Sequence, residues 1–477
     1  MSVSVLSKTR ARPWPLATAA AVCLLSFAAF WAAQRLAHVN MLDVMVYRAE
    51  GETVRAGGDL YAMRATSANL GMTYPPFAAL LFVPLTLVGV PLMRTLATGG
   101  NLLLVVALVL LSVRLVRPSL SRADLWRTTF WVAAVVVWCE PVWTTLRYGQ
   151  INLLIAVAVL WDLTRREGSR WAGLGIGLAT AVKLTPGLFV VLLLVAGVLL
   201  WRRDRSWNQW LRTAATATGV FLGTTLAVVV ALPADSKRFW TETLFETGRV
   251  GFAEETANQS IRGVLARLMH TDDPGTWWAV AAALLGGAAM VVAVRAALRG
   301  DRAVAVVVCA FTALMISPIS WSHHWVWCVP LLILLADRAT HAWRVTGAVA
   351  LVFASFALWW VPHDPGRPEL DQNAGQMLLS AVYPLTATAL LAGYVLTRRR
   401  ARGTEAGHGT EAGTTEASTA KAGTTEASTA KAGTTEAGTR TEAGKATEPA
   451  LEAVLPGVPE QEPRTAPERE RQAVAKE

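Results

Sequence analysis

The sequence predicts an all-α membrane protein that crosses the bilayer many times. Of its 477 residues, 53% are hydrophobic and 16% are charged, and the mean hydropathy is +0.39; soluble domains average about 25% charged residues. Many apolar runs approach about 20 residues, which is the length of a helix that crosses a ~30 Å hydrocarbon core. Tryptophan, which gathers at membrane–water interfaces, occurs 20 times. Spanning segments must pair their backbone polar groups internally, so they are expected to be helices.

The apolar segments predict a polytopic helical protein with 11–13 membrane segments, since some of the segments are short. Two long polar stretches, 35–74 and 234–275, separate groups of them. The segments lie at 15–34, 75–93, 96–116, 128–146, 151–162, 171–186, 187–201, 212–233, 276–294, 303–318, 324–336, 343–361 and 376–396.

The first segment, 15–34, follows a short basic stretch with Lys8, Arg10 and Arg12. Such a stretch also opens a signal peptide, but this segment is long and lacks a convincing small-residue cleavage site. We therefore interpret it as the first span, with residues 1–14 in the cytoplasm. Residues 15–400 are then one transmembrane domain.

Basic residues in the short loops orient the spans, because cytoplasmic loops carry an excess of lysine and arginine. If the spans alternate from residue 128 onward, the arginines of the short loops lie on one side, the cytoplasm. The opposite, external side then holds 148–152, 234–275, 317–324 and 361–375, and 35–74 also faces outward. Simple alternation from residue 1 would put the arginines between 114 and 127 outside. A re-entrant 75–93, which contains four prolines, would remove that conflict. The cytoplasmic arginines are Arg165, Arg166, Arg202, Arg203, Arg205, Arg295, Arg299, Arg302, Arg338, Arg344 and Arg398–Arg400.

The charge is divided between the apolar part of the chain and its tail. Residues 401–477 hold nine basic and 13 acidic residues, a net charge of −4. The remaining 400 residues therefore carry a net charge of +14, and the whole chain has +10. Because these basic residues lie in loops between spans, they indicate topology and contacts with anionic lipid, and no nucleic-acid partner. The tail repeats AGTTEASTAK at 412–421 and 422–431 and is predicted to be a disordered cytoplasmic segment.

The loop 35–74 carries the first candidate for chemistry. Asp43 follows the first span closely, and Asp43, Tyr47 and Glu50 have helical spacing, with Gly57-Gly58 to end that helix. A carboxylate held at the membrane surface can act as general base on a substrate hydroxyl. The alternative is that Asp43 caps an interfacial helix.

Two further motifs lie at span boundaries. Gln150 and Asn152 offer amides for a polar ligand, or for hydrogen bonds between helices. Lys183 is followed by Pro186, which interrupts a span, and an ionisable residue at such a place is often functional. Lys183 could hold a lipid phosphate, or it could extend its ammonium group to the interface.

The later external segments add amides, an arginine and a histidine pair. The 234–275 loop contains Asn258-Gln259-Ser260 and then Arg262, whose guanidinium suits phosphate. His323 and His324 stand between tryptophans and could bind phosphate, transfer a proton or ligate a metal, or anchor the chain in the aromatic belt. Adjacent histidines on a helix point about 100° apart, which disfavours one shared metal. The four cysteines lie in apolar segments without paired spacing.

Taken together, these motifs resemble glycosyltransferase family 87, whose members are polytopic glycosyltransferases of the GT-C type. The resemblance runs from about Asp43 to Arg398, and the histidine stretch looks most like actinobacterial α-1,2-mannosyltransferases that use polyprenyl-phosphate-mannose. The motifs that carry it are Asp43 with Tyr47, Gly58-Asp59-Leu60-Tyr61, Tyr74-Pro75-Pro76-Phe77, Gly149-Gln150-Ile151-Asn152, Lys183-Leu184-Thr185-Pro186, Asn258-Gln259-Ser260, and Ser317-Pro318-Ile319-Ser320-Trp321 with His323-His324.

The resemblance implies a reaction at the external face of the plasma membrane. A mannosyl residue would pass, with inversion, from polyprenyl-phosphate-mannose to a lipid-linked mannoside or mannan, forming an α-(1→2) linkage. Asp43 matches the catalytic aspartate of the family, and the leaving phosphate needs positive partners. Lys183, Arg262, His323 and His324 are the candidates for the phosphate; the candidates for the sugar and the acceptor are Tyr47, Asp59, Tyr74, Gln150, Asn152, Asn258, Gln259 and Trp321.

Two other functions remain open at this stage. The family also contains an arabinofuranosyltransferase with a decaprenyl-phosphate donor. A lipid or sugar transporter is a different class, but transporters usually contain paired repeats and polar residues at mid-membrane. No metal and no cofactor is predicted, because only isolated carboxylates lie near Asp43 and the lipid-linked sugar is a substrate.

Overall fold

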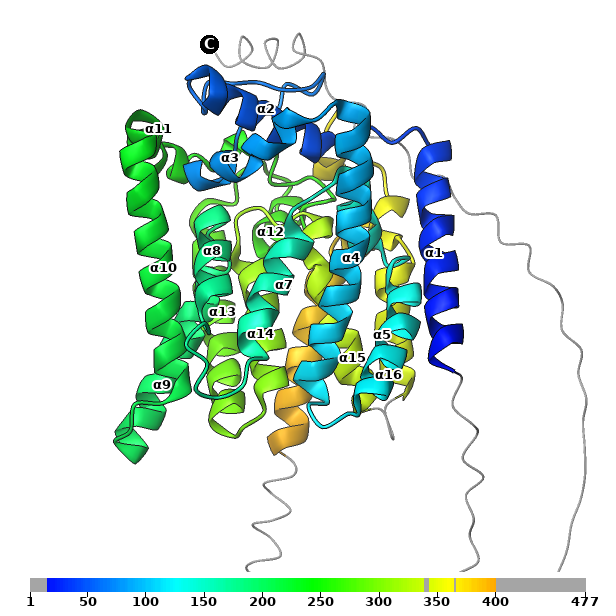
Figure 1. Cartoon of the computed structure of the whole chain (residues 1–477). Coiled ribbons are helices and arrows are strands. Elements are labelled where there is room, and N and C mark those ends of the chain that lie inside the picture. The colour runs from blue at the N-terminus through cyan, green and yellow to red at the C-terminus, as the bar shows by residue number, and fades with distance from the viewer. Residues whose placement is uncertain (1–14, 339–342, 364–365, 400–477) are drawn as a thin grey trace, which may run out of the picture. The chain divides into compact units, whose positions relative to one another are not determined.

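Long apolar helices form the framework of the structure. The computed structural model describes residues 15–338, 343–363 and 366–399, and four helices within them are long and apolar enough to cross a membrane (Figure 1). Two sharply bent pairs raise that number to six if each is one span. The predicted class, an all-α polytopic membrane protein, is confirmed. The four helices are α1 (Leu16–Leu36), α4 (Val90–Val116), α10 (Gln209–Ala231) and α13 (Gly275–Leu298); the pairs are α5 (Arg122–Val136) with α6 (Glu140–Tyr148), and α17 (Ala374–Ser380) with a C-terminal helix (Val382–Arg399).

Shorter helices lie between these spans. The total of 11–13 membrane segments stays a prediction, because length and composition identify only the helices above as candidate spans. Between the helices, the described residues contain only isolated β-bridges. These helices are α7 (Asn152–Leu163), α8 (Leu174–Val182), α9 (Gly187–Asp204), α12 (Ile261–Leu268), α14 (Arg302–Ile316), α15 (Cys328–Asp337) and α16 (Trp343–Ala354), with the 3₁₀ turns η2 (Thr243–Phe245), η3 (Thr247–Arg249), η4 (Ser322–Trp327), η5 (Ala357–Trp360) and η6 (Pro368–Asp371).

Prolines divide the predicted 75–93 segment. α3 (Pro76–Phe82) and the 3₁₀ helix η1 (Val83–Leu87) are short, and α4 begins at Val90 with Pro91 in its first turn. Proline fits at the start of a helix because it has no N–H to pair there. α3 and η1 pack against α2 (Leu42–Ala56), and all three lie with α11 (Pro233–Thr241) at the upper end of Figure 1. The 75–87 stretch therefore lies beside the 35–74 loop.

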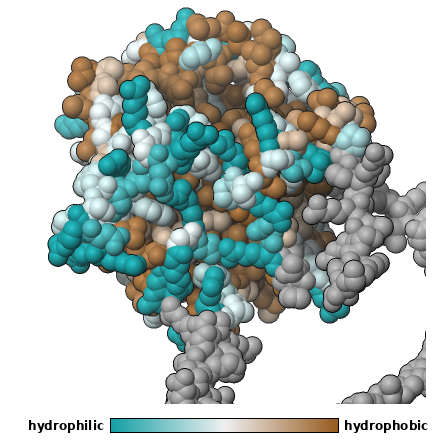
Figure 2. All heavy atoms as spheres, turned by 60° about the horizontal axis from the view of Figure 1, so that its bottom comes forward, coloured by the Kyte–Doolittle hydropathy of each residue, from teal (hydrophilic) through white to brown (hydrophobic). Residues whose placement is uncertain are grey.

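Arginines lie at the opposite end of the bundle. Arg202 and Arg203 are in the last turn of α9, and the connection from α13 to α14 has Arg295 and Arg302 at its two ends. The lower end of α9 lies away from α2 and α3 in Figure 1. Figure 2 turns that lower end toward the viewer and shows hydrophilic residues gathered over it, next to hydrophobic surface. We name the two ends the α2 end and the arginine end.

α1 has one face buried against the bundle and one exposed apolar face. Its buried residues form one stripe at helical spacing that packs on α5, while Leu24 and Leu25 are about 70% exposed. An exposed apolar face of this kind suits contact with lipid. The contacts divide the chain into two units, of which the first holds the described residues up to Leu391 and the second only 392–399 among them. Every residue discussed below belongs to the first unit.

Candidate functional site

α2 carries Asp43 to the α2 end of the bundle. The helix begins after Met41 and ends at Gly57, both with positive φ, and Gly57 is the stop that the sequence predicts. No side chain caps its first turn, so the alternative of Asp43 as the N-cap is not observed. α2 rests on Gly149, where an added Cβ would lie 3.0 Å from Met41 Cε and from Val44 Cβ. This close approach brings Asp43 beside Gln150.

Gln150 is the centre of a buried group of polar side chains. Its Oε1 accepts hydrogen bonds from the hydroxyls of Tyr47 (2.7 Å) and Tyr74 (3.4 Å), which lie 3.3 Å from each other. Since Oε1 is occupied in this way, the amide N–H groups are left to donate, and a side-chain hydrogen bond joins Gln150 to Asp43. The two tyrosines thus fix the amide that orients the carboxylate.

Lys183 lies on the other side of this group, at the break between α8 and α9. Its Nζ lies 3.3 Å from Asn152 Oδ1 and 3.1 Å from Nε2 of His324, and 5.5 Å from the centre of the Tyr74 ring. The side chain is half-buried, so it does not extend freely to the interface. The 3₁₀ turn with the histidines is held by Thr145 and Asn152, which donate to the carbonyl oxygen of His323.

We name these residues the acid–lysine cluster: Asp43, Tyr47, Tyr74, Gln150, Asn152, Lys183, His323 and His324. Tyr47 lies in the second turn of α2, and the other members lie at a helix terminus, in a loop or in the 3₁₀ turn η4; the helices between these segments run down and back up, so all meet at the α2 end. The sequence predicts every one of them as a site residue. Their roles in catalysis and binding stay predictions.

Asp43, Lys183 and His324 of the cluster have pKa values that differ from their usual ones. Burial raises the pKa of Asp43 to about 7, against the opposing effects of the Gln150 hydrogen bond and the Lys183 charge. Burial and the same Lys183 charge lower the pKa of His324 well below its usual value. A lysine ammonium can donate to Nε2 only when this imidazole is neutral. Lys183 is therefore the group of the cluster that can carry a positive charge, with its own pKa lowered to about 7 by burial, and the neutral histidines offer N–H groups.

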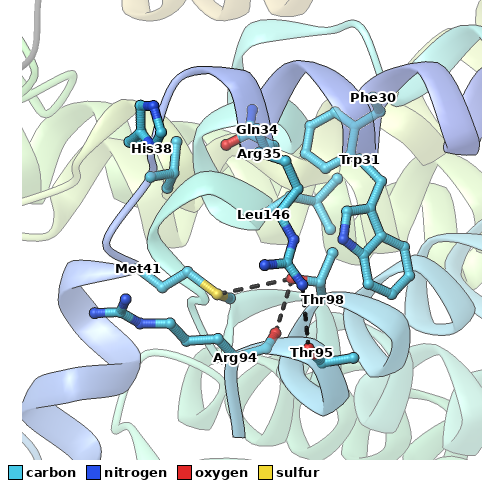
Figure 3. A pocket seen from close by; sticks show the side chains of 11 residues that line it. Phe30, Trp31, Gln34, Arg35, His38, Met41, Arg94, Thr95, Thr98 and Leu146 are labelled. Carbon is cyan, nitrogen blue, oxygen red and sulfur yellow. Dashed lines mark hydrogen bonds between the residues drawn. The ribbon is translucent and has the colours of Figure 1, made fainter. Parts of the chain in front are cut away.

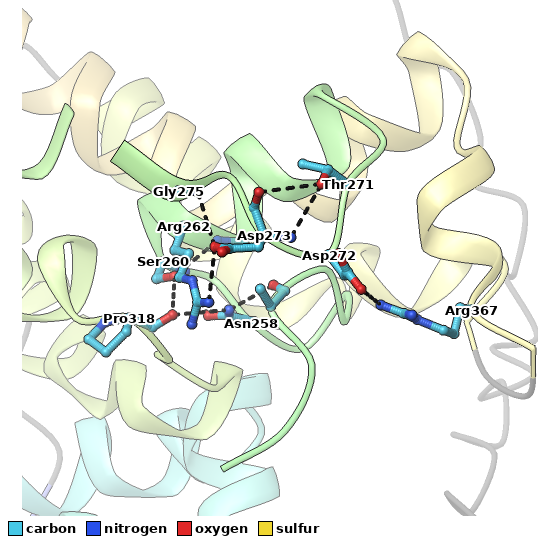
Figure 4. A network of polar contacts seen from close by, with 11 residues as sticks. Asn258, Ser260, Arg262, Thr271, Asp272, Asp273, Gly275, Pro318 and Arg367 are labelled. Atoms are coloured by element: carbon cyan, nitrogen blue, oxygen red, sulfur yellow. Dashed lines mark hydrogen bonds and ion pairs between the residues drawn. The ribbon is translucent and has the colours of Figure 1, made fainter. Parts of the chain in front are cut away.

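Three predicted residues, Asn258, Gln259 and Arg262, lie outside the cluster (Figure 4 draws Asn258 and Arg262). Asn258 Nδ2 donates to the carbonyl oxygens of Ala253 and Pro318, and its Oδ1 accepts from the Ser320 N–H. Gln259 Nε2 likewise donates to two carbonyl oxygens, and both side chains are fully buried. Arg262 pairs with Asp273 at 3.4 Å. In this structure these side chains hold the 234–275 loop together.

Asp59 and Trp321 also have other partners in the structure. The Asp59 carboxylate accepts from the backbone N–H groups of Tyr61 and Ala62 and pairs with Arg238 of α11. It thus fixes the loop after α2 to α11. The ring of Trp321 lies over Gly251, where an added Cβ would be 2.7 Å from it. The structure does not bring either residue into the acid–lysine cluster.

Glu140 is a residue that our reading of the sequence missed. It is fully buried at the sharp bend between α5 and α6, and its carboxylate accepts hydrogen bonds from four side chains. Two features could have revealed it: an ionisable residue inside an apolar segment, and a proline directly after it. Through Ser322 it holds the turn that carries the histidines. The donors are Thr144 (2.9 Å), Ser322 (2.8 Å), Trp359 (3.1 Å) and Tyr383 (2.7 Å).

Replacing Glu140 with alanine is expected to destabilise the protein by at least about 3 kcal/mol. Several buried donors would lose their acceptor, and each such loss costs about 1–3 kcal/mol. Thermal unfolding in detergent, followed by tryptophan fluorescence, measures the effect. Glu167→Ala, at an exposed loop position, is the matched control and should unfold like the wild type. Equal unfolding midpoints for the two variants would show that the hydrogen bonds of Glu140 contribute no stability.

Within the residues that the structure describes, no three His, Cys, Asp or Glu side chains are grouped so that they could hold a metal ion. The cluster itself offers a carboxylate, an amino group, imidazoles, amides and tyrosine hydroxyls. A carboxylate with a raised pKa can accept a proton near neutral pH, and an ammonium group can stabilise a developing negative charge. These are the requirements of a group transfer from a phosphate.

Comparison with known proteins gives consistent similarities. The model of glycosyltransferase family 87 matches residues 72–318. A Mycolicibacterium smegmatis polyprenol-phosphate-mannose-dependent α-(1-2)-phosphatidylinositol mannoside mannosyltransferase is 35% identical over 73% of this chain and 82% of its own. A Mycobacterium tuberculosis polyprenol-phosphate-mannose-dependent α-(1-2)-phosphatidylinositol pentamannoside mannosyltransferase is 34% identical over 68% and 73%. The crystal structure of ArnT from Cupriavidus metallidurans bound to undecaprenyl phosphate matches with a TM-score of 0.41, at 17% identity over 80% of this chain and 72% of that one.

Proposed function

Since the chain belongs to glycosyltransferase family 87, we propose that it transfers a mannosyl residue to a phosphatidylinositol mannoside and forms an α-(1→2) linkage with inversion. The chain is a polyprenyl-phosphate-sugar-dependent glycosyltransferase, as its relatives are. The names of those relatives support mannose as the sugar and a phosphatidylinositol mannoside as the acceptor. The observation that carries the mechanism is the placement of Asp43 and Lys183 in one cluster.

In the proposed reaction the Asp43 carboxylate accepts the proton of the acceptor hydroxyl. The hydroxyl oxygen then forms a bond to the anomeric carbon of mannose, while the bond from that carbon to the phosphate oxygen breaks. Polyprenyl phosphate leaves with the electron pair. Lys183 stabilises this leaving group, because an ammonium group placed where negative charge develops lowers the barrier. Attack from the face opposite the leaving group inverts a β-linked donor into an α-linked product.

The arginine end supports an external position for this site. Cytoplasmic loops carry the excess of basic residues, and Arg202, Arg203 and Arg295 lie at helix ends away from α2. The acid–lysine cluster is at the α2 end. We therefore place the reaction at the external face of the plasma membrane and the N-terminus in the cytoplasm, with the polyprenyl chain of the donor in the bilayer.

The test is sugar transfer by the full-length protein in phosphatidylcholine nanodiscs. The assay supplies radiolabelled polyprenyl-phosphate-mannose with a phosphatidylinositol mannoside, and digestion with an α-1,2-specific mannosidase reads the linkage of the product. Release of the label by this enzyme is the expected result. A protein that is inert with mannose but active with decaprenyl-phosphate-arabinose would reject the proposed sugar. A product that resists the mannosidase would reject the linkage.

A further inference from the structure

A cavity of about 220 Å³ lies between the C-terminal end of α1 and the N-terminal end of α4 (Figure 3). Its walls come from the last turns of α1, the connection to α2, the first turns of α4, and Leu146 of α6. The cavity is smaller than pockets that enclose a whole drug-sized ligand, so it suits a head group.

The lining of this cavity favours an anion. Arg35 and Arg94 bring two guanidinium groups to it from different helices, and His38 adds an imidazole. No aspartate or glutamate is among the described residues that line it, so nothing there neutralises the arginines. Arginine presents a fork of N–H groups that matches phosphate oxygens.

Two of the residues that line the cavity carry a buried polar atom without a hydrogen-bond partner among the described residues. Gln34 is 9% exposed and its Oε1 accepts no hydrogen bond, while Nε of Arg94 donates none. Buried polar groups are nearly always paired, so an unpaired acceptor and an unpaired cationic donor in the walls of one cavity favour an occupant that pairs with both. That occupant would need a hydroxyl for Gln34 as well as an anionic oxygen for Arg94.

Exposed leucines lie close to the lining residues in the sequence. Leu36 follows Arg35, Leu96 follows Thr95 and Leu92 is two residues before Arg94, and they are 81%, 58% and 52% exposed. Trp31 lines the cavity, and tryptophan suits the boundary between head groups and acyl chains. A lipid could therefore place its head group between α1 and α4 while its chains remain in the bilayer.

We propose that this cavity binds the phosphodiester and adjoining polyol of a membrane lipid substrate. The inference rests on the proposed function, in which Lys183 holds the phosphate of the donor, so the cavity is assigned to the phosphodiester and inositol of the lipid acceptor. Met41 lines the cavity and Asp43 follows two residues later, so their Cα atoms are at most about 7 Å apart. A head group bound here would be held next to the carboxylate.

The test measures lipid binding directly and does not depend on sugar transfer. Full-length protein in phosphatidylcholine nanodiscs is titrated with radiolabelled phosphatidylinositol in one arm and radiolabelled polyprenyl-phosphate-mannose in the other. The Arg35→Gln/Arg94→Gln variant should weaken the binding of phosphatidylinositol by about tenfold or more, because a hydrogen bond to a charged group is lost. Binding of polyprenyl-phosphate-mannose should not change, and a loss confined to this donor would overturn the assignment to the acceptor.

The matched control is Arg55→Gln. Like Arg35, Arg55 is exposed and donates to a threonine of a neighbouring segment, Thr86 in its case and Thr95 for Arg35, but it does not line the cavity. Gln34→Leu, which keeps both arginines, should also weaken the binding of phosphatidylinositol. Unfolding midpoints verify that each variant is folded. Unchanged binding of both lipids to the folded double variant would overturn the proposal. A wild-type protein that binds the lipid but transfers no sugar would reject the proposed function and leave this cavity assignment standing.

Discussion

The Asp43→Asn variant is expected to lose sugar transfer by a factor of about 10² to 10⁴, the usual contribution of a positioned general base. Asparagine has nearly the same shape and can still bond to Gln150, but it cannot accept the proton of the acceptor hydroxyl. The loss should therefore appear in kcat, with little change in the binding of either lipid. Initial rates in nanodiscs at saturating donor and acceptor measure it.

Glu52→Gln is the matched control for this variant. Glu52 is on the same helix, is 53% exposed and pairs with Arg48, and a surface pair of this kind contributes little stability. Its activity should equal that of the wild type. A folded Asp43→Asn protein with near wild-type transfer would remove Asp43 from the mechanism.

The pH dependence of the wild type is part of the same expectation. A general base acts as its anion, and burial raises the pKa of Asp43 to about 7. Activity should therefore rise with pH through about 7 and fall again above it, because burial also lowers the pKa of Lys183 to about 7 and its ammonium group then loses its charge; an ordinary aspartate would already be ionised near pH 4. A profile of kcat/KM between pH 5 and 9 shows where the rise occurs.

The Lys183→Met variant is expected to lower transfer by about 10²- to 10³-fold, comparable with the removal of one donor from an anion-stabilising site. Methionine keeps most of the apolar stem of the side chain and removes the ammonium group, with its charge and its hydrogen bonds to Asn152 and His324. Because Lys183 also lowers the pKa of Asp43, the rise in the pH profile should move to higher pH in this variant. A merely structural role of Lys183 would not shift the profile.

Lys237→Met provides the comparison for the lysine. Lys237 is exposed on α11, so its loss tests whether any positive charge at the α2 end supports activity. Wild-type rates in Lys237→Met and a strong loss in Lys183→Met would assign the effect to the cluster. Equal losses would mean that general attraction of anionic lipid explains both.

Much of the cluster could be predicted because its residues stand at recognisable positions. Asp43 and Tyr47 follow a span with helical spacing, and Gln150, Lys183 and His324 stand where apolar segments end. Alternating spans bring such positions to one face of the membrane, and the resemblance to glycosyltransferase family 87 assigns them to one site. The helical class follows in the same way from apolar length.

What could not be predicted depends on partners far away in the chain. Asn258 and Gln259 carry the same amide as Gln150, but their hydrogen bonds are made within the framework of the loop. Glu140 accepts from Tyr383, 243 positions later, and no local pattern indicates that contact. The tail that the sequence predicts as disordered, 401–477, lies outside the described residues.

The length of α1 has a consequence for the membrane in which the enzyme works. At 1.5 Å per residue its 21 residues span about 31 Å, close to the thickness of a typical hydrocarbon core. Only residues 37–41 join it to the helix that carries Asp43. A bilayer of another thickness would be met by tilting of α1, and the tilt would displace Arg35 and Met41. We therefore expect transfer rates to depend on acyl-chain length, with a maximum where the bilayer matches α1; reconstitution in lipids of graded chain length would reveal this dependence, and a flat response would exclude it.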